Sequence, residues 1–411
     1  MKYRFLLSTL LAIFCSSIHA QNNSLPIIPL PQIVTFTSGN FALPKKPVII
    51  LSGTNTQANR FAAEVINQTL KSFYNTGAVI KEGAPEKGAI VLFQYSQPQT
   101  GETDLPAGFL TEGYKMLSTK DGIIIKSLSQ NGILYGSMSL VQLLEKAVNK
   151  SLPAFEITDW PDMKIRGISD DISRGQVSTL ENFKKIIRSL ARYKMNVYMP
   201  YLEDMIKFDA YPSIGENRGA LTKNEVRELV SYAGMYGIDV VPAFQTLGHY
   251  ENILSKPEFL KYAEFPGAAS LNISYDSTYI FLNKMLKEIF DLFPSKYFNM
   301  GADETYDVGL GKSKALVANS SMPNALLNHY KKVYDIIKNS GRKVLMYGDI
   351  ILSHPEILDS LPKDIILVDW HYRADTEYPS TKIFSRAGHD YYVSPSVWNF
   401  QTTFPTQVNA I

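Results

Sequence analysis

The sequence predicts an α/β protein with a small α+β domain followed by a (β/α)8 TIM barrel, C-terminally truncated with about seven strands present. Three observations support this fold. Apolar strand segments alternate with amphipathic helices after residue 164, which indicates a parallel sheet covered by helices. Polar side chains follow these strands, as they do at the C-terminal rim of a barrel. No glycine-rich phosphate loop follows any strand, which disfavours an open nucleotide-binding sheet.

The first twenty residues have the features of a signal peptide. Lys2 and Arg4 precede the apolar run "FLLSTLLAIF", and the small-residue end "SIHA" follows it. We therefore expect cleavage after Ala20 and export, either to the periplasm or as a secreted protein. A lipid anchor on Cys15 is the alternative, although the bulky Phe14 fits that processing poorly. The apolar run is too short for an integral membrane span.

Composition limits the possible partners of the mature chain. The protein has 41 Lys and Arg against 39 Asp and Glu, and the signal carries two of the basic residues and none of the acidic ones. The mature chain is therefore expected to be neutral, which gives no indication of nucleic acid or an anionic membrane as partner. Its only cysteine leaves with the signal, so it is expected to depend on its core rather than on disulfides. The sequence leaves the oligomeric state open.

Residues 21–160 are expected to form the α+β domain, and residues 161–411 the barrel. In the first domain, the strand candidates are residues 47–51, 88–94, 113–119 and 122–128, and the helix candidates are residues 56–74 and 133–147. In the barrel, the strand candidates are "KIRGIS", "MNVYMPYL", "DVVPAF", "YFNMGA", "KVLMYG", "IILVDW" and "YYVSPSV". Seven strands do not close an eight-stranded barrel, and the last of them lies close to Ile411. The expectation is therefore that this chain is a C-terminally truncated product.

The residues expected at the C-terminal rim come from each strand in turn. They are Asp170, Asp171 and Arg174; Glu203 and Asp204; Gln245 and His249; Asp303 and Glu304; Asp349; and Asp369, Trp370 and Trp398. The adjacent pair Asp303-Glu304 is unusual because neighbouring carboxylates raise the cost of ionising each other. A turn with two solvated acids is the simplest interpretation of such a pair. Only motifs elsewhere in the chain can favour a catalytic interpretation over this one.

Ordered motifs along the chain resemble the β-N-acetylhexosaminidases of glycoside hydrolase family 20. "EGYKMLSTKDGIIIKSLSQNGILYGSMSLVQLL" resembles the end of that family's accessory domain, and "DWPDMKIRG" resembles its first barrel strand. "FDAYPSIGENRGALTKNEVRELVSYAGMYGIDVVPAFQTLGHYE" resembles the run from strand two to strand three, and "NMGADE" resembles the catalytic Gly-x-Asp-Glu. The resemblance covers nearly all of the chain after the signal. It implies the TIM barrel, a glycan substrate with a terminal N-acetylhexosamine, and no cofactor.

The resemblance also implies roles for individual residues. Glu304 becomes the general acid, and Asp303 orients the substrate's 2-acetamido group so that its own oxygen attacks the anomeric carbon. An ionised Asp303 is expected to favour a proton on Glu304. Arg166 is placed as a binder of sugar hydroxyl groups, with a structural ion pair at the barrel base as the alternative. His249 is placed in a network with the catalytic pair, although it could also be a hydrogen-bonded loop histidine.

The remaining candidates for substrate binding are less specific. Glu203 is preferred to Asp204 as the strand-two acid near His249, and Asp349 is the polar candidate after strand five. Trp370, Trp398 and Tyr347 are candidates for the aromatic wall of a sugar pocket. Core packing is the alternative for the two tryptophans.

The chain departs from the family pattern in three places. Met300-Gly301-Ala302 replaces a second glycine and a preceding histidine, Tyr347 stands where a tryptophan is common, and "YLEDMIKF" lacks the usual Asp-Asp-Gln-x-Trp. These departures affect the expected sugar preference more than the expected reaction.

Two other functions compete with the hexosaminidase hypothesis. One is a barrel glycosidase for a sugar without an acetamido group, which needs a distant second carboxylate, with Asp369 as the obvious candidate. The other is a non-catalytic glycan-binding protein on a degraded barrel. Metal binding is the weakest possibility, because the chain has 6 histidines and none stands at ligand spacing from His249.

Overall fold

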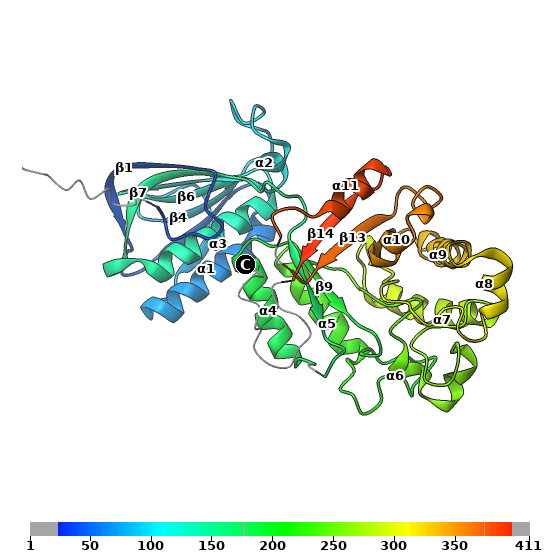
Figure 1. Cartoon of the computed structure of the whole chain (residues 1–411). Coiled ribbons are helices and arrows are strands. Elements are labelled where there is room, and N and C mark those ends of the chain that lie inside the picture. The colour runs from blue at the N-terminus through cyan, green and yellow to red at the C-terminus, as the bar shows by residue number, and fades with distance from the viewer. Residues whose placement is uncertain (1–23, 176, 374, 397–411) are drawn as a thin grey trace, which may run out of the picture.

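The computed structural model describes residues 24–175, 177–373 and 375–396. The first part of the chain forms a mixed seven-stranded sheet with the strand order β1-β7-β5-β6-β4-β2-β3 (Figure 1). Its strands are β1 (Ile33–Ala42), β2 (Val48–Gly53), β3 (Val79–Glu82), β4 (Ile90–Gln94), β5 (Tyr114–Thr119), β6 (Gly122–Ser127) and β7 (Ser151–Asp159). Its helices are α1 (Thr56–Tyr74), α2 (Ala107–Glu112) and α3 (Gln130–Lys146), with a short 3-10 turn at Val148–Lys150.

Two helices cover one face of this sheet. Figure 1 shows α1 and α3 side by side below the strands. Every residue of α3 from Gly132 to Leu144 is buried, because the sheet lies on one side of this helix while α1 and the barrel helix α4 (Leu180–Arg192) pack on others. A helix that is buried around most of its circumference joins two layers. The helix α3 therefore connects the accessory domain to the barrel.

Within the described part of the chain, seven parallel strands follow in consecutive order. They are β8 (Gly167–Asp171), β9 (Val197–Tyr201), β10 (Asp239–Val240), β11 (Tyr297–Asn299), β12 (Lys343–Tyr347), β13 (Ile366–His371) and β14 (Tyr391–Pro395). Ala243 bridges to Tyr201 on one side and to Asn299 on the other, so the pairing continues from β9 through to β11. This consecutive parallel order is that of a (β/α)8 barrel, as the sequence predicted.

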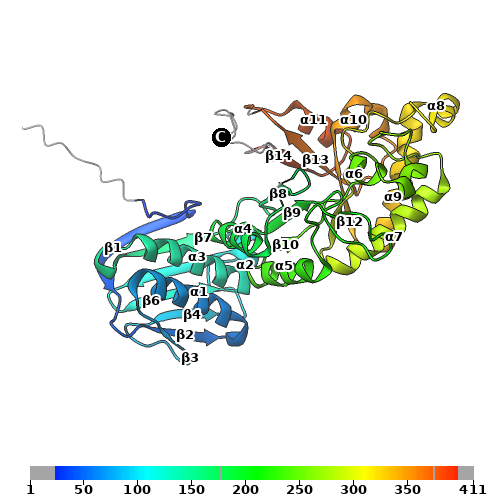
Figure 2. The same cartoon turned by 90° about the horizontal axis from the view of Figure 1, so that it is seen from below.

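The barrel helices surround these strands (Figure 2). They are α4, α5 (Lys223–Met235), α6 (Glu251–Leu254), α7 (Asp276–Leu292), α8 (Lys314–Ser320), α9 (Met322–Asn339), α10 (Asp349–Ser353) and α11 (Pro379–Arg386), with 3-10 turns at Pro257–Tyr262 and Pro355–Ile357. The N-termini of α4 and α5 are encoded locally. The hydroxyl of Thr179 accepts from the N–H of Asn182, and Thr222 forms a capping box with Glu225.

All seven predicted barrel strands are present. In the accessory domain, β1, β3 and β7 were missed. The strands β1 and β3 lie at the two edges of the sheet and are mostly exposed, so they lack the apolar pattern that marks a buried strand. An eighth barrel strand, expected to be missing from a truncated chain, would follow residue 396, outside the described residues.

Buried and partly buried polar contacts join the two parts of the chain at the N-terminal end of the barrel. Lys194 Nζ lies 2.9 Å from Asp159 Oδ2, and both side chains are about nine-tenths buried. Arg166 Nη1 lies 3.0 Å from Glu112 Oε2 at the end of α2. The carbonyl of Arg192 accepts from Gln142 Nε2 of α3 at 2.9 Å. These contacts fix the connector between β7 and β8.

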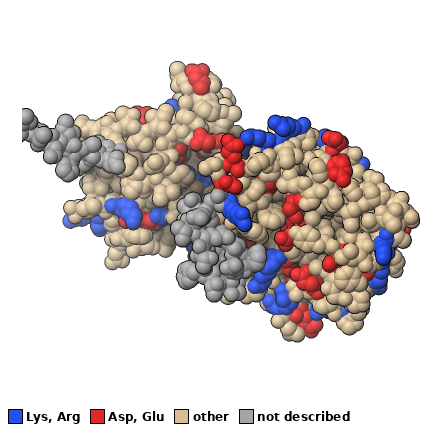
Figure 3. All heavy atoms as spheres, viewed as in Figure 1, with Lys and Arg blue, Asp and Glu red and all other residues tan. Residues whose placement is uncertain are grey.

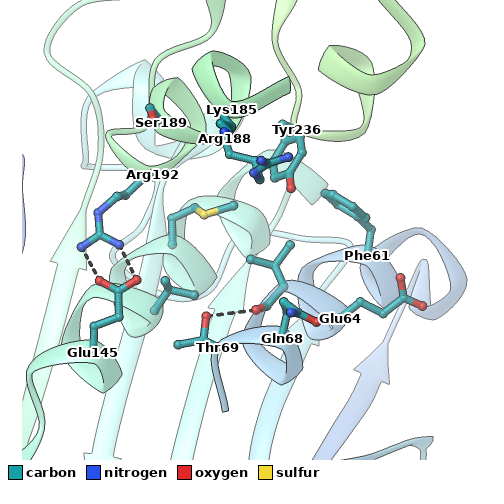
Figure 4. Close-up of a pocket in the computed structure, with 13 residues that line it drawn as sticks. Phe61, Glu64, Gln68, Thr69, Glu145, Lys185, Arg188, Ser189, Arg192 and Tyr236 are labelled. Carbon is teal, nitrogen blue, oxygen red and sulfur yellow. Dashed lines mark hydrogen bonds and ion pairs between the residues drawn. The ribbon is translucent and has the colours of Figure 1, made fainter. Parts of the chain in front are cut away.

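A cavity of about 570 Å³ lies between α1, α3 and α4 (Figure 4). Arg192 and Glu145 form an ion pair at one end, and the rings of Phe61 and Tyr236 meet edge to face at 4.8 Å at the other. The candidate site residues that the structure describes all lie away from the lining of this cavity.

Surface charge is mixed. Figure 3 shows acidic and basic side chains interspersed among uncharged ones on one face. Within the described residues, no helix combines the length and the apolar character needed to cross a membrane.

The Lys194–Asp159 pair provides a test of the domain junction. Lys194→Met leaves an uncompensated buried carboxylate, so we expect the free energy of unfolding to fall by about 3–5 kcal/mol. The double variant Lys194→Met/Asp159→Asn should recover most of this loss. Urea denaturation followed by circular dichroism measures both variants. Lys382→Met, which breaks an exposed pair with Glu377, is the control and should leave the midpoint unchanged. A single Lys194 variant as stable as the parent protein would contradict the prediction.

Candidate active site

The adjacent acids lie on a tight turn that directly follows β11. Ala302 has φ +74° and Glu304 has φ +50°, a region that residues with side chains rarely occupy. Two side chains hold this turn. The N–H of Ala302 donates to Gln245 Oε1 at 3.1 Å, and the N–H of Glu304 donates to Asp349 Oδ2 at 2.9 Å. A Cβ on Gly301 would meet Gln245 Oε1 at 2.3 Å, so only glycine allows this close approach.

His249 brings the two acids together. Its Nε2 lies 3.5 Å from Asp303 Oδ2 and 3.4 Å from Glu304 Oε2. Gly248 makes this approach possible, because a Cβ there would meet Asp303 O at 3.0 Å. The Asp303 side chain is 14% exposed and that of Glu304 is 39% exposed. The two carboxylates therefore contact the same side of one imidazole, with Glu304 closer to solvent.

The charge on His249 reverses the expectation for Glu304. Burial alone would lower the pKa of His249, but its contacts with Asp303 and Glu304 and the charges of Asp303 and Glu203 raise it to about 10. The ring therefore carries a proton at neutral pH. In turn, His249 holds the pKa of Glu304 below its ordinary value. The expected raising of the Glu304 pKa by Asp303 is thus wrong for the unliganded site, because the contact with His249 and the nearby Arg174 outweigh the effect of burial on the pKa.

Arg174 and Glu203 complete the charged cluster. Arg174 Nη2 lies 3.1 Å from Glu203 Oε1 and 3.4 Å from His249 Nδ1, and its Nη1 pairs with Asp171. The Arg174 guanidinium also lies over the ring of Tyr201, 5.2 Å from its centroid. Burial raises the pKa of Glu203 to about 7, although Arg174 opposes this shift.

Two residues predicted for the site lie elsewhere. Arg166 precedes β8, so it lies at the N-terminal end of the barrel, where it pairs with Glu112 and donates to the carbonyl of Lys194. Its expected role in sugar binding is therefore wrong, and the structural alternative is the one observed. Asp204 is 1% exposed and pairs with Arg218 at 2.7 Å, so its carboxylate is engaged in a separate ion pair.

Aromatic side chains lie at the same end of the barrel strands as the two acids. Tyr347 is buried, and its N–H donates to the carbonyl of Gly301 at 3.0 Å, two residues before Asp303. The rings of Tyr347 and Tyr201 lie 6.4 Å apart. Trp370, at the C-terminal end of β13, lies 4.9 Å from Tyr372 ring to ring. The charges of Glu304 and Asp303 also act on Tyr372. Trp398 lies outside the described residues.

The Asp349 side chain contributes to the site by binding the backbone of the turn rather than by facing a substrate. Its Oδ2 accepts from the N–H of Glu304, and burial raises its pKa to about 6. The amide of Glu304 lowers this pKa and the nearby Asp303 raises it. Asp349 therefore positions the catalytic turn.

Three site residues were not predicted as substrate-binding or catalytic. Arg174 was expected at the rim but was given no role in binding, although it follows the first barrel strand and the rim rule favours it over Arg166. Gln245 follows the third barrel strand, so its position at the rim also favoured a role in the site. Tyr372 had no such signal, because a single tyrosine two residues after Trp370 is indistinguishable from an ordinary loop residue in the sequence.

The structure engages Asp369, the candidate for a distant second carboxylate, in other contacts. It is 2% exposed, accepts from Ser380 Oγ at 2.6 Å and lies 3.0 Å from His371 Nε2. Within the described ranges, no group of three or more His, Cys, Asp or Glu residues has the arrangement of metal ligands.

Comparisons with known proteins agree on one family. The model for the catalytic domain of glycosyl hydrolase family 20 matches residues 164–409, and the model for domain 2 of that family matches residues 24–160. The β-hexosaminidase of Porphyromonas gingivalis is 27% identical over 380 residues, which are 84% of this chain and 47% of that protein. The β-hexosaminidase of Vibrio furnissii is 26% identical over 394 residues, which are 84% of this chain and 60% of that protein.

Solved structures share the fold. The exo-β-N-acetylglucosaminidase of Vibrio harveyi, in complex with N-acetylglucosamine, matches with a TM-score of 0.75 at 20% identity over 90% of this chain and 60% of that chain. The β-N-acetylhexosaminidase of Bacteroides fragilis matches with a TM-score of 0.71 at 22% identity over 89% and 74%. The chain spans roughly half to three-fifths of the length of the two curated relatives above. The catalytic-domain model alone covers more than half of the chain, and the chain belongs to glycosyl hydrolase family 20.

Proposed function

We propose that this protein is an exported, exo-acting β-N-acetylhexosaminidase that removes terminal β-linked GlcNAc or GalNAc from glycans with retention of configuration. The observation that carries the proposal is the position of Asp303 and Glu304 on one side of His249. Most retaining glycosidases place an acid and a nucleophile about 5–5.5 Å apart on opposite sides of the scissile bond. Adjacent residues of one turn approach from a single side, so the nucleophile must come from elsewhere. Family 20 is a substrate-assisted exception.

In this mechanism the sugar supplies the nucleophile. The acetamide oxygen attacks the anomeric carbon and forms an oxazolinium ring as the bond to the leaving oxygen breaks. Asp303 accepts a hydrogen bond from the acetamide N–H and stabilises the positive charge that develops on the ring. Glu304, the more exposed acid, donates a proton to the leaving oxygen. It then removes a proton from the water that opens the ring.

The proton for the first step starts within the charged cluster. In the unliganded protein the pKa of His249 is raised to about 10 and that of Glu304 is lowered, which together favour a proton on the imidazole over one on Glu304. A bound sugar excludes water and disfavours the ionised carboxylate, which favours transfer of this proton from Nε2 to Glu304. His249 thus acts as the proton store for the general acid.

The alternative glycosidase, with Asp369 as nucleophile, lacks support because Ser380 and His371 already engage that carboxylate. The non-catalytic alternative predicts binding without turnover. Activity on matched substrates separates both alternatives from the proposal.

The first test compares nitrophenyl β-GlcNAc with nitrophenyl β-glucoside, using the purified full-length protein. We expect hydrolysis of the acetamido sugar alone, and a loss of kcat of about a hundredfold in Asp303→Asn, because one preorganised contact to developing charge is removed. Equal hydrolysis of both sugars would contradict the substrate-assisted mechanism. Binding of GlcNAc without hydrolysis, in a folded protein, would favour the glycan-binding alternative.

Asp349 allows a second test that separates position from charge. Asp349→Ala removes the acceptor for the Glu304 N–H, and we expect kcat to fall by about tenfold to a hundredfold, in line with the loss of a hydrogen bond to a charged group. Asp349→Asn keeps a carbonyl acceptor and should retain most of the activity. Steady-state kinetics on nitrophenyl β-GlcNAc measures both variants.

The matched control is Asp239→Ala, which removes a partly buried aspartate at the other end of the barrel, where it accepts from Ser295 Oγ. It should lower stability without lowering the kcat of the folded fraction. If Asp349→Asn lost as much activity as Asp349→Ala, the positioning role of the acceptor would be disproved.

A further inference from the structure

Residues that follow β10 bind the end of β11 and the start of the turn that carries Asp303 and Glu304. The N–H of Phe244 donates to the carbonyl of Asn299 at 3.0 Å, and Thr246 Oγ1 donates to the carbonyl of Met300 at 2.8 Å. Between them, Gln245 reaches further along the turn. This segment therefore aligns the turn with the third barrel strand.

The contacts of Gln245 define the orientation of its amide group. Its Oε1 accepts from the N–H of Ala302, so its Nε2 must point the other way. That Nε2 donates to Tyr201 Oη at 2.7 Å and to Asp303 Oδ1 at 2.5 Å. The side chain is 1% exposed, and the Tyr250 hydroxyl donates to its main-chain carbonyl at 2.7 Å. With neighbours on all of these atoms, the amide has one orientation.

The donor on Asp303 has a chemical consequence. An amide N–H remains a donor at every pH, so the contact from Gln245 Nε2 to Asp303 Oδ1 does not itself change with pH. Because Gln245 occupies Oδ1, the other oxygen, Oδ2, is the one left to accept from a substrate. Oδ2 is also the oxygen that faces His249.

We propose that Gln245 is the positioning residue for Asp303, holding Oδ1 through a donor that does not titrate and thereby directing Oδ2 to the substrate's acetamide N–H. This inference deepens the proposed hexosaminidase function and rests on it. Gln245 acts through Asp303 and does not itself contact the sugar.

Gln245→Glu tests the proposal with a side chain of the same shape. When protonated, the introduced carboxyl group can donate to Asp303 and still accept from Ala302, so it reproduces the native contacts. When ionised, it loses the donor and repels Asp303. The proton shared by the introduced carboxyl group and Asp303 is lost as the pH rises. The loss of kcat must therefore grow from acid to neutral pH.

The expected kinetic result is a change in the pH profile. At pH 7.5 we expect kcat on nitrophenyl β-GlcNAc to be about tenfold or more below that of the parent protein, and at pH 5 within about threefold of it. Gln245→Met, which has no donor, should lose activity to a similar extent at both pH values. An unchanged profile in Gln245→Glu, or full activity in Gln245→Met, would overturn the proposal.

A matched control separates positioning from stability. Gln94→Glu changes another buried glutamine, in β4 of the accessory domain, where its amide accepts from Asn59 and donates to Leu128. We expect it to alter thermal stability and to leave the shape of the pH profile of kcat intact. The same pH-dependent loss in Gln94→Glu would assign the effect to folding and would overturn the role of Gln245.

A binding measurement keeps this inference separate from the proposed activity. Free GlcNAc carries the acetamide N–H, so its calorimetric affinity reports on Asp303 without any turnover. We expect Gln245→Glu to weaken binding at pH 7.5 by about tenfold and to restore it at pH 5. An inactive parent protein with this binding pattern would refute the proposed hydrolysis while supporting the positioning role. Equal affinity at both pH values would refute the positioning role.

Discussion

The candidate active site depends on a short turn whose backbone would not hold its conformation alone. Gly301, Ala302 and Glu304 all have positive φ values, and the two non-glycine residues cost about 1–3 kcal/mol each. Hydrogen bonds from three directions offset this strain. Gln245 accepts from Ala302, Asp349 accepts from Glu304, and the N–H of Tyr347 donates to the carbonyl of Gly301. The strained turn thus presents both carboxylates toward His249.

The protonation states of the site are a property of the cluster rather than of any single acid. His249 lies against two carboxylates and near a third, so it keeps a proton that an isolated imidazole would lose near neutral pH. Glu203 is buried and has a pKa of about 7, whereas Glu304 faces solvent and the imidazolium. Environment, and not residue type, separates the roles of these glutamates.

The two ends of the barrel carry different tasks. The N-terminal end holds the buried pair Lys194–Asp159 and the partly buried pair Arg166–Glu112, which join the barrel to the accessory domain. The C-terminal end holds the catalytic turn, His249 and Arg174. This division follows the general rule that barrel chemistry lies at the C-terminal ends of the strands and stability at the other end. It also explains why two arginines eight residues apart have unrelated functions.

The sequence by itself determined the barrel strands and pointed to a two-part organisation and to the adjacent acids Asp303 and Glu304, because apolar alternation and the Gly-Ala-Asp-Glu turn are local patterns. It also brought His249, Glu203, Asp349, Tyr347 and Trp370 into consideration through their positions after strands. Only the tertiary structure decided between Arg166 and Arg174, because both flank β8 and only the strand direction separates them. The same holds for the low pKa of Glu304 and for the hydrogen bond of Gln245 to Asp303. Each arises from contacts between residues 55 or more positions apart, which no local pattern encodes.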